Sequence, residues 1–383
     1  MEECKTYTLE EISKGKGGYG IAAPAVEYNP NLYKYLRITD INDDGSLKRE
    51  SVMSVSDDKA EKYLLHKNDI VFARTGNSTG RTYFYEETEG ELVYAGFLIK
   101  FSLDETKVNP KILKYYTHSQ LYYDWVRSFD TGGTRGNINA KTFGSMPIML
   151  PNRTIQDKIV NILSSLDDKI ELNRRINANL EEQAQALFKS WFIDFEPFKD
   201  GKFVDSELGM IPEGWKVGTL EDLIEIRYGK DHKKLNDGNI PVYGSGGIMR
   251  YVETAIYDRE SVLIPRKGTL NNVMYVNQPF WSVDTMFYTI MKEPNIAKFV
   301  YLFLERKDLS AMNNGSAVPS MTTNILNSLQ VVLPSKDIFK RFEEVVGAIW
   351  NVRMSNLQES ARLSALRDTL LPKLMSGEIN IES

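Results

Sequence analysis

Basic and amide side chains recur beside glycines and other small residues in several segments of this 383-residue chain. Arginine, lysine, asparagine and glutamine at loop tips can hydrogen-bond to base edges, and lysine and arginine can also pair with phosphates. Recognition of a nucleic acid is therefore one chemistry that these residues could perform. The candidates are Lys14, Lys16, Tyr19, Arg74, Asn77, Arg81, Arg135 and Asn137 in the first part of the chain, and Lys230, Lys233, Lys234, Ser245, Arg266 and Lys267 further on.

Two of these residues, Arg74 and Arg266, occupy equivalent places in two similar stretches. Both follow a short apolar run, in DIVFARTG at 69–76 and SVLIPRKG at 261–268, which predicts a strand that ends at the arginine. Equivalence favours a contact with DNA, but it also fits a structural role such as pairing with an internal carboxylate. For each of the other candidates, the alternative is an ordinary solvated loop charge.

Motifs for catalysis, nucleotide binding and metal binding do not fit. GNSTGRT at 76–82 has the wrong spacing for a phosphate loop, and no other segment matches that pattern. GKGGYG at 15–20 has the glycine spacing of a dinucleotide cradle but no apolar strand before it, which favours a mobile loop. DINDDG at 40–45 opens like a calcium loop, but its twelfth position is Ser51, so a hairpin turn is favoured. With one cysteine and three scattered histidines, we expect no metal site.

Composition restricts the class further. The chain has 47 Lys and Arg against 52 Asp and Glu, and the net charge of −5 argues against a general polyanion binder without excluding a basic groove. We find no apolar run long enough to span a membrane and no apolar core of a signal peptide, so a cytoplasmic location is expected. The length predicts two or more domains.

An internal repeat with an offset of 183 residues organises the chain. At this offset, Leu150-Pro151 aligns with Leu333-Pro334. Looser similarity precedes each copy, as in YTLEEI at 7–12 and GTLEDLIEI at 218–226, and AGFLIKF at 95–101 aligns with DTMFYTI at 284–290. Each copy therefore predicts a β-rich globular unit followed by a long helix.

The two long helices have the clearest periodicity. Apolar residues recur at steps of three or four from Ile155 to Trp191 and from Phe342 to Leu370, which predicts one buried stripe on each helix. A helix from 155 to 190 would be about 54 Å long. Pro372 should kink or fray the second helix. The stripe of the second helix is expected to include Val345, Val352 and Leu366.

Each stripe carries an asparagine at its middle, Asn173 and Asn356, and these residues are also 183 apart. If the helices pack antiparallel about a pseudo-twofold axis, the two asparagines meet near that axis. A buried pair costs stability but specifies register, and the alternative is that both residues face solvent. If the pair is buried, Asn356→Leu should raise the melting temperature.

The end of the first long helix is too apolar for a free surface. Its aromatic residues are expected to pack against the neighbouring globular unit or against a partner subunit. These residues are Phe188, Trp191, Phe192 and Phe195.

The order of these segments resembles the specificity (S) subunits of type I restriction-modification systems over essentially the whole chain. The first domain departs from this pattern, because it lacks the IPEGW lead of the second. The similar stretches are FDTGGTRGNINAKTFGSMPIMLPNRTIQDKIVNILSSLDDKIELN at 129–173, LEEQAQALFKSWFIDFEPF at 180–198, LGMIPEGWKVGTLEDL at 208–223 and LLPKLMSGEI at 370–379.

The resemblance implies an α/β (α+β) fold class with two similar globular target recognition domains and a pseudo-twofold internal repeat. Two long antiparallel helices would form a coiled-coil spacer between the domains. The expected segments are a first target recognition domain at 1–150, a central spacer helix at 151–198, a second domain at 199–334 and a C-terminal spacer helix at 335–383.

In function, the resemblance implies that each domain reads one half of a bipartite, asymmetric target in double-stranded DNA. The helices would set the gap between the halves and dock two modification (methyltransferase) subunits, and two restriction (translocase and nuclease) subunits would complete the enzyme. S-adenosylmethionine, ATP and Mg²⁺ are expected on those partners, with no cofactor, catalysis or membrane contact in this chain. The alternatives are a coiled-coil adaptor with two protein-binding domains and a solitary nuclease.

Overall fold

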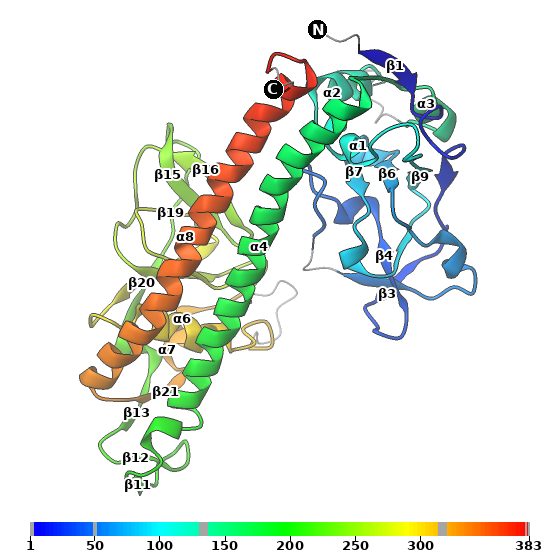
Figure 1. Cartoon of the computed structure of the whole chain (residues 1–383). Coiled ribbons are helices and arrows are strands. Elements are labelled where there is room, and N and C mark those ends of the chain that lie inside the picture. The colour runs from blue at the N-terminus through cyan, green and yellow to red at the C-terminus, as the bar shows by residue number, and fades with distance from the viewer. Residues whose placement is uncertain (1–3, 49–51, 130–136, 313–319, 380, 382–383) are drawn as a thin grey trace. The chain divides into compact units, whose positions relative to one another are not determined.

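A computed structural model describes all residues except 1–3, 49–51, 130–136, 313–319, 380 and 382–383 (Figure 1). The chain divides into two compact units, Met1–Glu171 with Glu359–Ser383, and Leu172–Gln358. Each unit therefore combines one globular domain with the adjoining halves of both long helices, whereas the expected segments separated the domains from the helices.

The first unit contains two four-stranded sheets and one two-stranded pair, and each short helix begins at a polar cap or a proline. The order in the first sheet is β2 (Gly18–Tyr19), β9 (Leu98–Ser102), β6 (Asp69–Ala73) and β7 (Thr82–Phe84). The order in the second is β3 (Ala25–Glu27), β5 (Met53–Val55), β4 (Tyr33–Leu36) and β8 (Leu92–Tyr94). The remaining elements are the antiparallel pair β1 (Lys5–Thr8) and β10 (Pro147–Leu150), and the helices α1 (Lys111–Tyr116), α2 (Gln120–Arg127) and α3 (Ala140–Gly144).

The second unit repeats this order of elements. Its main sheet is β14 (Ile224–Tyr228), β20 (Met286–Met291), β17 (Ser261–Pro265) and β18 (Met274–Val276). A second sheet is β16 (Gly247–Val252), β15 (Asp237–Gly244) and β19 (Trp281–Ser282). The other elements are β13 (Lys216–Thr219) with β21 (Gln330–Leu333), β11 (Phe203–Val204) with β12 (Ile211–Pro212), and the helices α5 (Leu220–Leu223), α6 (Ala297–Glu305) and α7 (Thr323–Asn327).

The internal repeat is confirmed at the level of topology. The strand order β2-β9-β6-β7 in the first unit matches β14-β20-β17-β18 in the second. The central strands β6 and β17 are buried along their whole length, as expected for runs of apolar residues bounded by polar ones. These two strands are the rigid elements at whose ends Arg74 and Arg266 begin their loops.

The two long helices are α4 (Arg153–Phe192) and α8 (Lys336–Met375), each of 40 residues. Helix α4 begins after Asn152, whose side-chain oxygen accepts a hydrogen bond from the backbone N–H of Ile155 at 3.0 Å. It ends near Phe195, which has a left-handed backbone (φ 55°), so the helix stops short of the expected residue 198. Helix α8 continues through Pro372 to Met375, so the proline lies in its last turn and does not end it.

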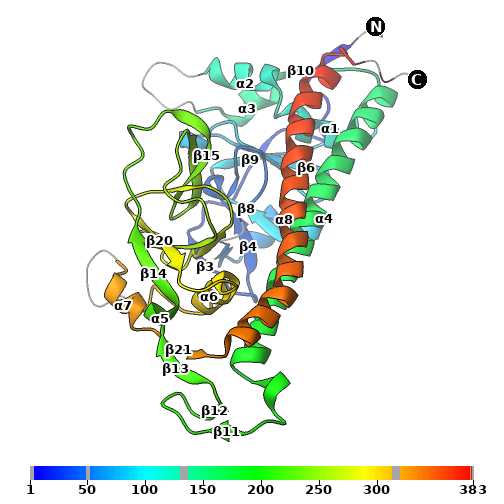
Figure 2. The same cartoon turned by 90° about the vertical axis from the view of Figure 1, so that its left-hand side faces the viewer.

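The helices run antiparallel in both units, as predicted (Figures 1 and 2). In the first unit, Lys169 Nζ of α4 lies 3.2 Å from Glu359 Oε2 of α8. In the second, Asn177 Nδ2 of α4 donates to the carbonyl of Arg353 at 3.2 Å. Contacts further along α4 therefore involve residues earlier in α8, as expected for antiparallel helices.

The predicted stripe of α8 is wrong at three positions, because Val345, Val352 and Leu366 are exposed. In the second unit the buried residues are instead Val346 and Trp350, one position away in the first case. For Val345 and Val352, the physical reason is that this part of α8 packs on two neighbours at once, α4 and the domain helix α6, which Figure 2 shows beside it. A heptad reading assumes a single partner helix.

The two central asparagines do meet between the helices. Asn173 is 1 % exposed, and its Nδ2 lies 3.5 Å from the carbonyl oxygen of Asn356. Asn356 is partly exposed, and its own side chain donates to Oδ1 of Asn177 at 2.9 Å. The expected pair is therefore asymmetric, with one deeply buried member.

This asymmetry moves the stability test from Asn356 to Asn173. Asn173→Leu should raise the melting temperature by a few degrees, because it replaces a buried amide, which costs stability where it specifies register. Asn356→Leu should change it little, since that side chain is partly solvated and already bonded to Asn177. Thermal unfolding of both variants beside the wild type measures the difference, and a lower melting temperature for Asn173→Leu would contradict the assignment.

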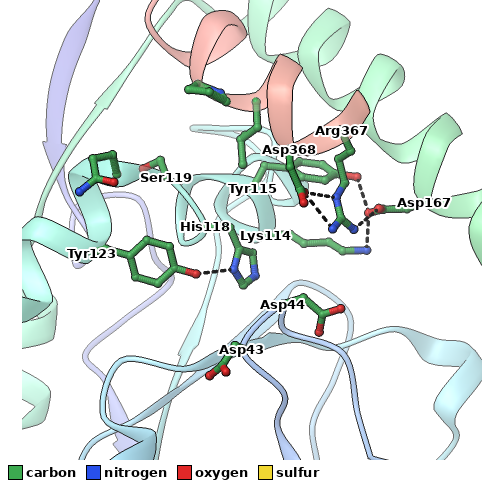
Figure 3. A pocket seen from close by; sticks show the side chains of 13 residues that line it. Asp43, Asp44, Lys114, Tyr115, His118, Ser119, Tyr123, Asp167, Arg367 and Asp368 are labelled. Atoms are coloured by element: carbon green, nitrogen blue, oxygen red, sulfur yellow. Dashed lines mark hydrogen bonds and ion pairs between the residues drawn. The ribbon is translucent and has the colours of Figure 1, made fainter. Parts of the chain in front are cut away.

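A partly buried ion network ties the first domain to its halves of the long helices (Figure 3). Asp167 of α4 lies 3.0 Å from Arg367 Nη1 of α8 and 3.1 Å from Lys114 Nζ of α1. The hydroxyl of Tyr115 donates to the same carboxylate at 3.0 Å. The network borders a pocket of about 470 Å³ into which His118 faces, and burial lowers the pKa of His118 to about 4.

Candidate nucleic-acid interface

In the first unit, the candidate interface forms around Arg74, the residue that follows β6. Its backbone N–H donates to the carbonyl of Phe97 at 3.1 Å, and its carbonyl accepts from the N–H of Ile138 at 3.0 Å. The guanidinium carbon lies 5.2 Å from the centroid of the Tyr19 ring, which is a cation–π distance. Tyr19 is 44 % exposed, so the pair lies at the surface.

In the second unit, Arg266 has the same surroundings at the end of β17. Its N–H donates to the carbonyl of Thr285 at 2.9 Å, and its carbonyl accepts from the N–H of Met321 at 2.9 Å. Its guanidinium carbon lies 5.4 Å from the ring centroid of Tyr228. The sequence equivalence of the two arginines is therefore confirmed as structural equivalence.

A Tyr-Gly step explains how each tyrosine reaches its arginine. Gly20 donates its N–H to the carbonyl of Leu98 at 3.2 Å, and Gly229 donates to the carbonyl of Met286 at 3.0 Å. A side chain on Gly20 would collide with the carbonyl oxygen of Ala95, and one on Gly229 would collide with a carbonyl of the corresponding turn. Only glycine allows this close approach of two backbones.

The structure corrects the alignment of these turns by one residue. The N–H of Leu98 donates to the carbonyl of Ala95, and the N–H of Met286 donates to that of Val283. Ala95 is therefore equivalent to Val283, whereas the sequence comparison placed it opposite Asp284. The error arose because two short apolar segments can be aligned equally well one residue apart when the turns before them share no residue that marks the register.

The electrostatic setting separates Arg74 and Arg266 from Arg81. Within the described part of the chain, neither of the first two forms an ion pair, so the internal-carboxylate alternative does not apply to them there. Arg81 is instead ion-paired, since its Nε donates to Oδ1 of the exposed Asp43 at 2.6 Å and its Nη1 donates to the carbonyl of Ile41. Arg266 Nη1 donates to the carbonyl of Asp284 at 3.3 Å. Ring stacking without a counter-ion leaves the other guanidinium N–H groups available to an outside acceptor.

The other predicted residues fall into three groups. Ser245 abuts the Arg266 loop, because a side chain on Gly268 would meet its hydroxyl, and Asn137 precedes the residue bonded to Arg74. Lys267 is exposed beside Arg266, and its N–H donates to the same carbonyl of Thr285 at 3.2 Å. Arg135 lies outside the described residues. The remaining candidates are exposed, and no side-chain contact among the described residues joins them to the arginine–tyrosine pairs: Lys14, Lys16, Asn77, Lys230, Lys233 and Lys234.

Sequence reasoning missed two aromatic residues of these sites. Tyr228 escaped notice because it ends an ordinary strand pattern, although the Tyr-Gly dipeptide that it shares with Tyr19 was a usable signal. Phe97 lies in the segment AGFLIKF at 95–101, which the repeat comparison aligned without singling out this residue. It is 57 % exposed, and its ring centroid lies 6.0 Å from the Arg74 guanidinium carbon.

The aromatic end of α4 packs into the core of the second unit. Phe188 and Phe192 are 3 % and 5 % exposed. Trp191 and Phe195 are partly buried against the same cluster. Of the two expected alternatives, the neighbouring globular unit is therefore the one that the structure supports.

Comparison with known proteins identifies the class. A family model described as the type I restriction modification DNA specificity domain matches residues 1–182 and 212–350. The chain therefore belongs to this family, and its role is DNA sequence specificity in a type I restriction-modification system.

Individual relatives agree over most of the length. The HindI specificity subunit of Haemophilus influenzae is 25% identical, with 99% of this chain and 100% of that protein covered. The MjaIX specificity subunit of Methanocaldococcus jannaschii is 26% identical, over 70% of this chain and 69% of that protein. The crystal structure of the S subunit from M. genitalium has a similar fold, with a TM-score of 0.56, 17% identity and coverage of 98% and 96%.

Two further features concern the described residues. No helix among them is long and apolar enough to cross a bilayer. Within the same residues, no group of three or more His, Cys, Asp and Glu side chains is arranged to hold a metal ion.

Proposed function

We propose that each unit reads one half of a bipartite DNA target, and that Arg74 and Arg266 are the base-reading residues. The observation that carries this proposal is the repeated arrangement of an arginine, without an ion-pair partner among the described residues, held over an exposed tyrosine at the end of a buried strand. Stacking orders the guanidinium before binding, so less side-chain entropy is lost when it bonds to a guanine edge.

The proposal includes the partners of the chain. The long helices dock two modification subunits, and two restriction subunits complete the assembly in the cytoplasm. Exposed apolar side chains on the second unit's parts of α4 and α8 support a docking role, because such residues gather where a partner covers them. They are Leu172, Ile176, Val352 and Leu357.

Catalysis belongs to the partners in this proposal. S-adenosylmethionine, ATP and Mg²⁺ bind to the modification and restriction subunits, and this chain supplies sequence recognition. The competing hypothesis, a coiled-coil adaptor that does not bind DNA, differs in a simple way. With the modification subunit present, an adaptor would show no sequence-dependent retardation of duplexes in a gel.

Arg74→Ala and Arg266→Ala test the base-reading role. In cells that carry the chain and its modification subunit, mapping of methylated adenines should give two short motifs at a constant gap. We expect Arg74→Ala to relax one base pair in one half and Arg266→Ala to relax one in the other. The affinity for the cognate duplex should fall about 5- to 150-fold, the range for a lost bidentate contact.

Arg153→Ala is the matched control, because Arg153 is a surface arginine of α4 paired with Asp157 at 2.9 Å. It should leave both motifs unchanged. A uniform loss of affinity for all sequences with a flatter salt dependence would instead assign the arginines to phosphates. Unchanged methylation in both variants would contradict the proposal.

A further inference from the structure

Phe97 is an exposed aromatic side chain at a place where the fold gives it no packing role. It lies in the turn between β8 and β9 and is 57 % exposed, and none of the buried clusters of the first unit includes it. Its backbone carbonyl anchors Arg74 at 3.1 Å, and its ring lies on the Arg74 guanidinium at 6.0 Å. The tip of this turn therefore presents an apolar ring and a cation side by side.

The second unit lacks this ring. Thr285 takes the equivalent place, because its carbonyl accepts the N–H of Arg266 at 2.9 Å just as Phe97 accepts that of Arg74. The arginine–tyrosine pair is common to both units, so it cannot distinguish their targets. The residue beside the arginine does differ between the units, since it is Phe97 in the first and Thr285 in the second. Its place next to the arginine allows it to distinguish the two targets.

We propose that Phe97 is a specificity-determining residue that contacts the 5-methyl group of a thymine in the base pair next to the guanine read by Arg74. This inference rests on the proposed base-reading role of Arg74. Arginine reads guanine O6 and N7 in the major groove, and the thymine methyl group is displayed in the same groove one step away. The first half-site therefore contains a G·C pair beside a T·A pair.

The charge distribution favours DNA as the occupant of this surface. The ring lies beside a guanidinium that forms no ion pair among the described residues, and the Tyr19 ring centroid lies 5.2 Å from the same guanidinium carbon. A protein partner that buried Phe97 would have to desolvate this cation as well, at a cost that a carboxylate or phosphate acceptor must offset.

The experiment uses the full chain assembled with its modification subunit and a duplex that carries the mapped target. Each thymine of the first half-site is replaced in turn by uracil, which lacks only the methyl group. For the wild type, one replacement should weaken binding about fourfold, the effect of one buried methyl group. Phe97→Ala should bind the thymine and uracil duplexes equally at that position and still prefer guanine at its neighbour.

Two further variants make the result interpretable. Phe97→Leu keeps an apolar contact and should retain the thymine preference. If Phe97 acted only by stacking its ring on Arg74, this variant would lose that preference. Tyr28→Ala removes another exposed aromatic residue of the same unit, 52 % exposed, and should behave like the wild type. Melting curves of all variants should coincide, and Phe97→Ser, which also removes the apolar contact, replaces Phe97→Ala in the assay if the alanine variant unfolds.

The inference is overturned if the wild type is indifferent to uracil at every thymine of the first half-site. It is also overturned if Phe97→Ala keeps the wild-type ratio of affinities for the thymine and uracil duplexes, whether or not this variant still prefers guanine at the neighbouring position. Failure of the underlying function has a different signature, since the wild-type assembly would then show no preference for the mapped target over an unrelated duplex.

Discussion

Phe192→Ala should lower the free energy of unfolding by about 3–5 kcal/mol, the cost of removing a buried aromatic ring. Phe192 is 5 % exposed near the end of α4. Its ring centroid lies 4.8 Å from that of Phe299 in α6 and 4.8 Å from that of Phe342 in α8. One side chain thus joins both long helices to the second domain, and its loss leaves a cavity among rigid elements that cannot easily close it.

Ile193→Ala is the control for this prediction. Ile193 is the next residue, but it is 46 % exposed, so its truncation should change the free energy of unfolding by no more than about 0.5 kcal/mol. Denaturant unfolding followed by tryptophan fluorescence and circular dichroism measures both variants. If Phe192→Ala unfolds like the wild type but no longer assembles with the modification subunit, Phe192 contacts a partner and the core assignment fails.

The elements that the sequence predicted well are those with long or repeated patterns. The periodicity from Ile155 to Trp191 extends over ten turns, so chance breaks in the pattern do not hide the helix. The equivalence of Arg74 and Arg266 was visible because each follows a fully buried strand, and such strands are conspicuous apolar runs. These signals are local, and the sequence carries them directly.

The phase of a helix is harder to predict than its presence. Val345 and Val352 fit the spacing of a stripe as well as the buried Val346 and Trp350 do, because valine, isoleucine and tryptophan crowd this part of α8. Which face turns inward depends on α6, an element that lies about forty residues earlier in the chain. Tertiary packing therefore decides which face of α8 is buried, and the helix's own sequence pattern does not predict it.

The candidate site shows the same division. Arg74 and Arg81 lie seven residues apart in one loop-rich segment and look alike as loop arginines. They differ because Asp43, almost forty residues earlier, comes within 2.6 Å of Arg81 and not of Arg74. Exposure of Phe97 was equally hidden, since an aromatic residue before a β run is usually buried. Residue type predicted the chemistry, and long-range contacts decided which residues are free to perform it.

Asp167→Ala should lower the free energy of unfolding by about 2–4 kcal/mol, because it leaves two partly buried cations without their shared anion. The Asp167 side chain is 15% exposed, and those of Arg367 and Lys114 are 22% and 31% exposed. Because the cations remain partly exposed, the loss of unfolding free energy should be smaller than for a fully desolvated ion pair. The adjacent Asp168→Ala, at an exposed position of the same helix, should have little effect.

The pH dependence of this difference identifies its electrostatic origin. Burial opposes ionisation of Asp167, but Lys114 and Arg367 outweigh it and hold the pKa of the carboxyl below its ordinary value. A carboxyl with a lowered pKa in the folded state stabilises the fold above the pKa of the unfolded chain, about 4, and this stabilisation is lost as the pH falls through the folded-state pKa. Wild type and Asp167→Ala should therefore differ fully at pH 7 and converge below pH 4, as measured by denaturant midpoints across that range. A difference that stays constant down to acidic pH would mean that Asp167 acts through packing and hydrogen bonds to Tyr115, and not through its charge.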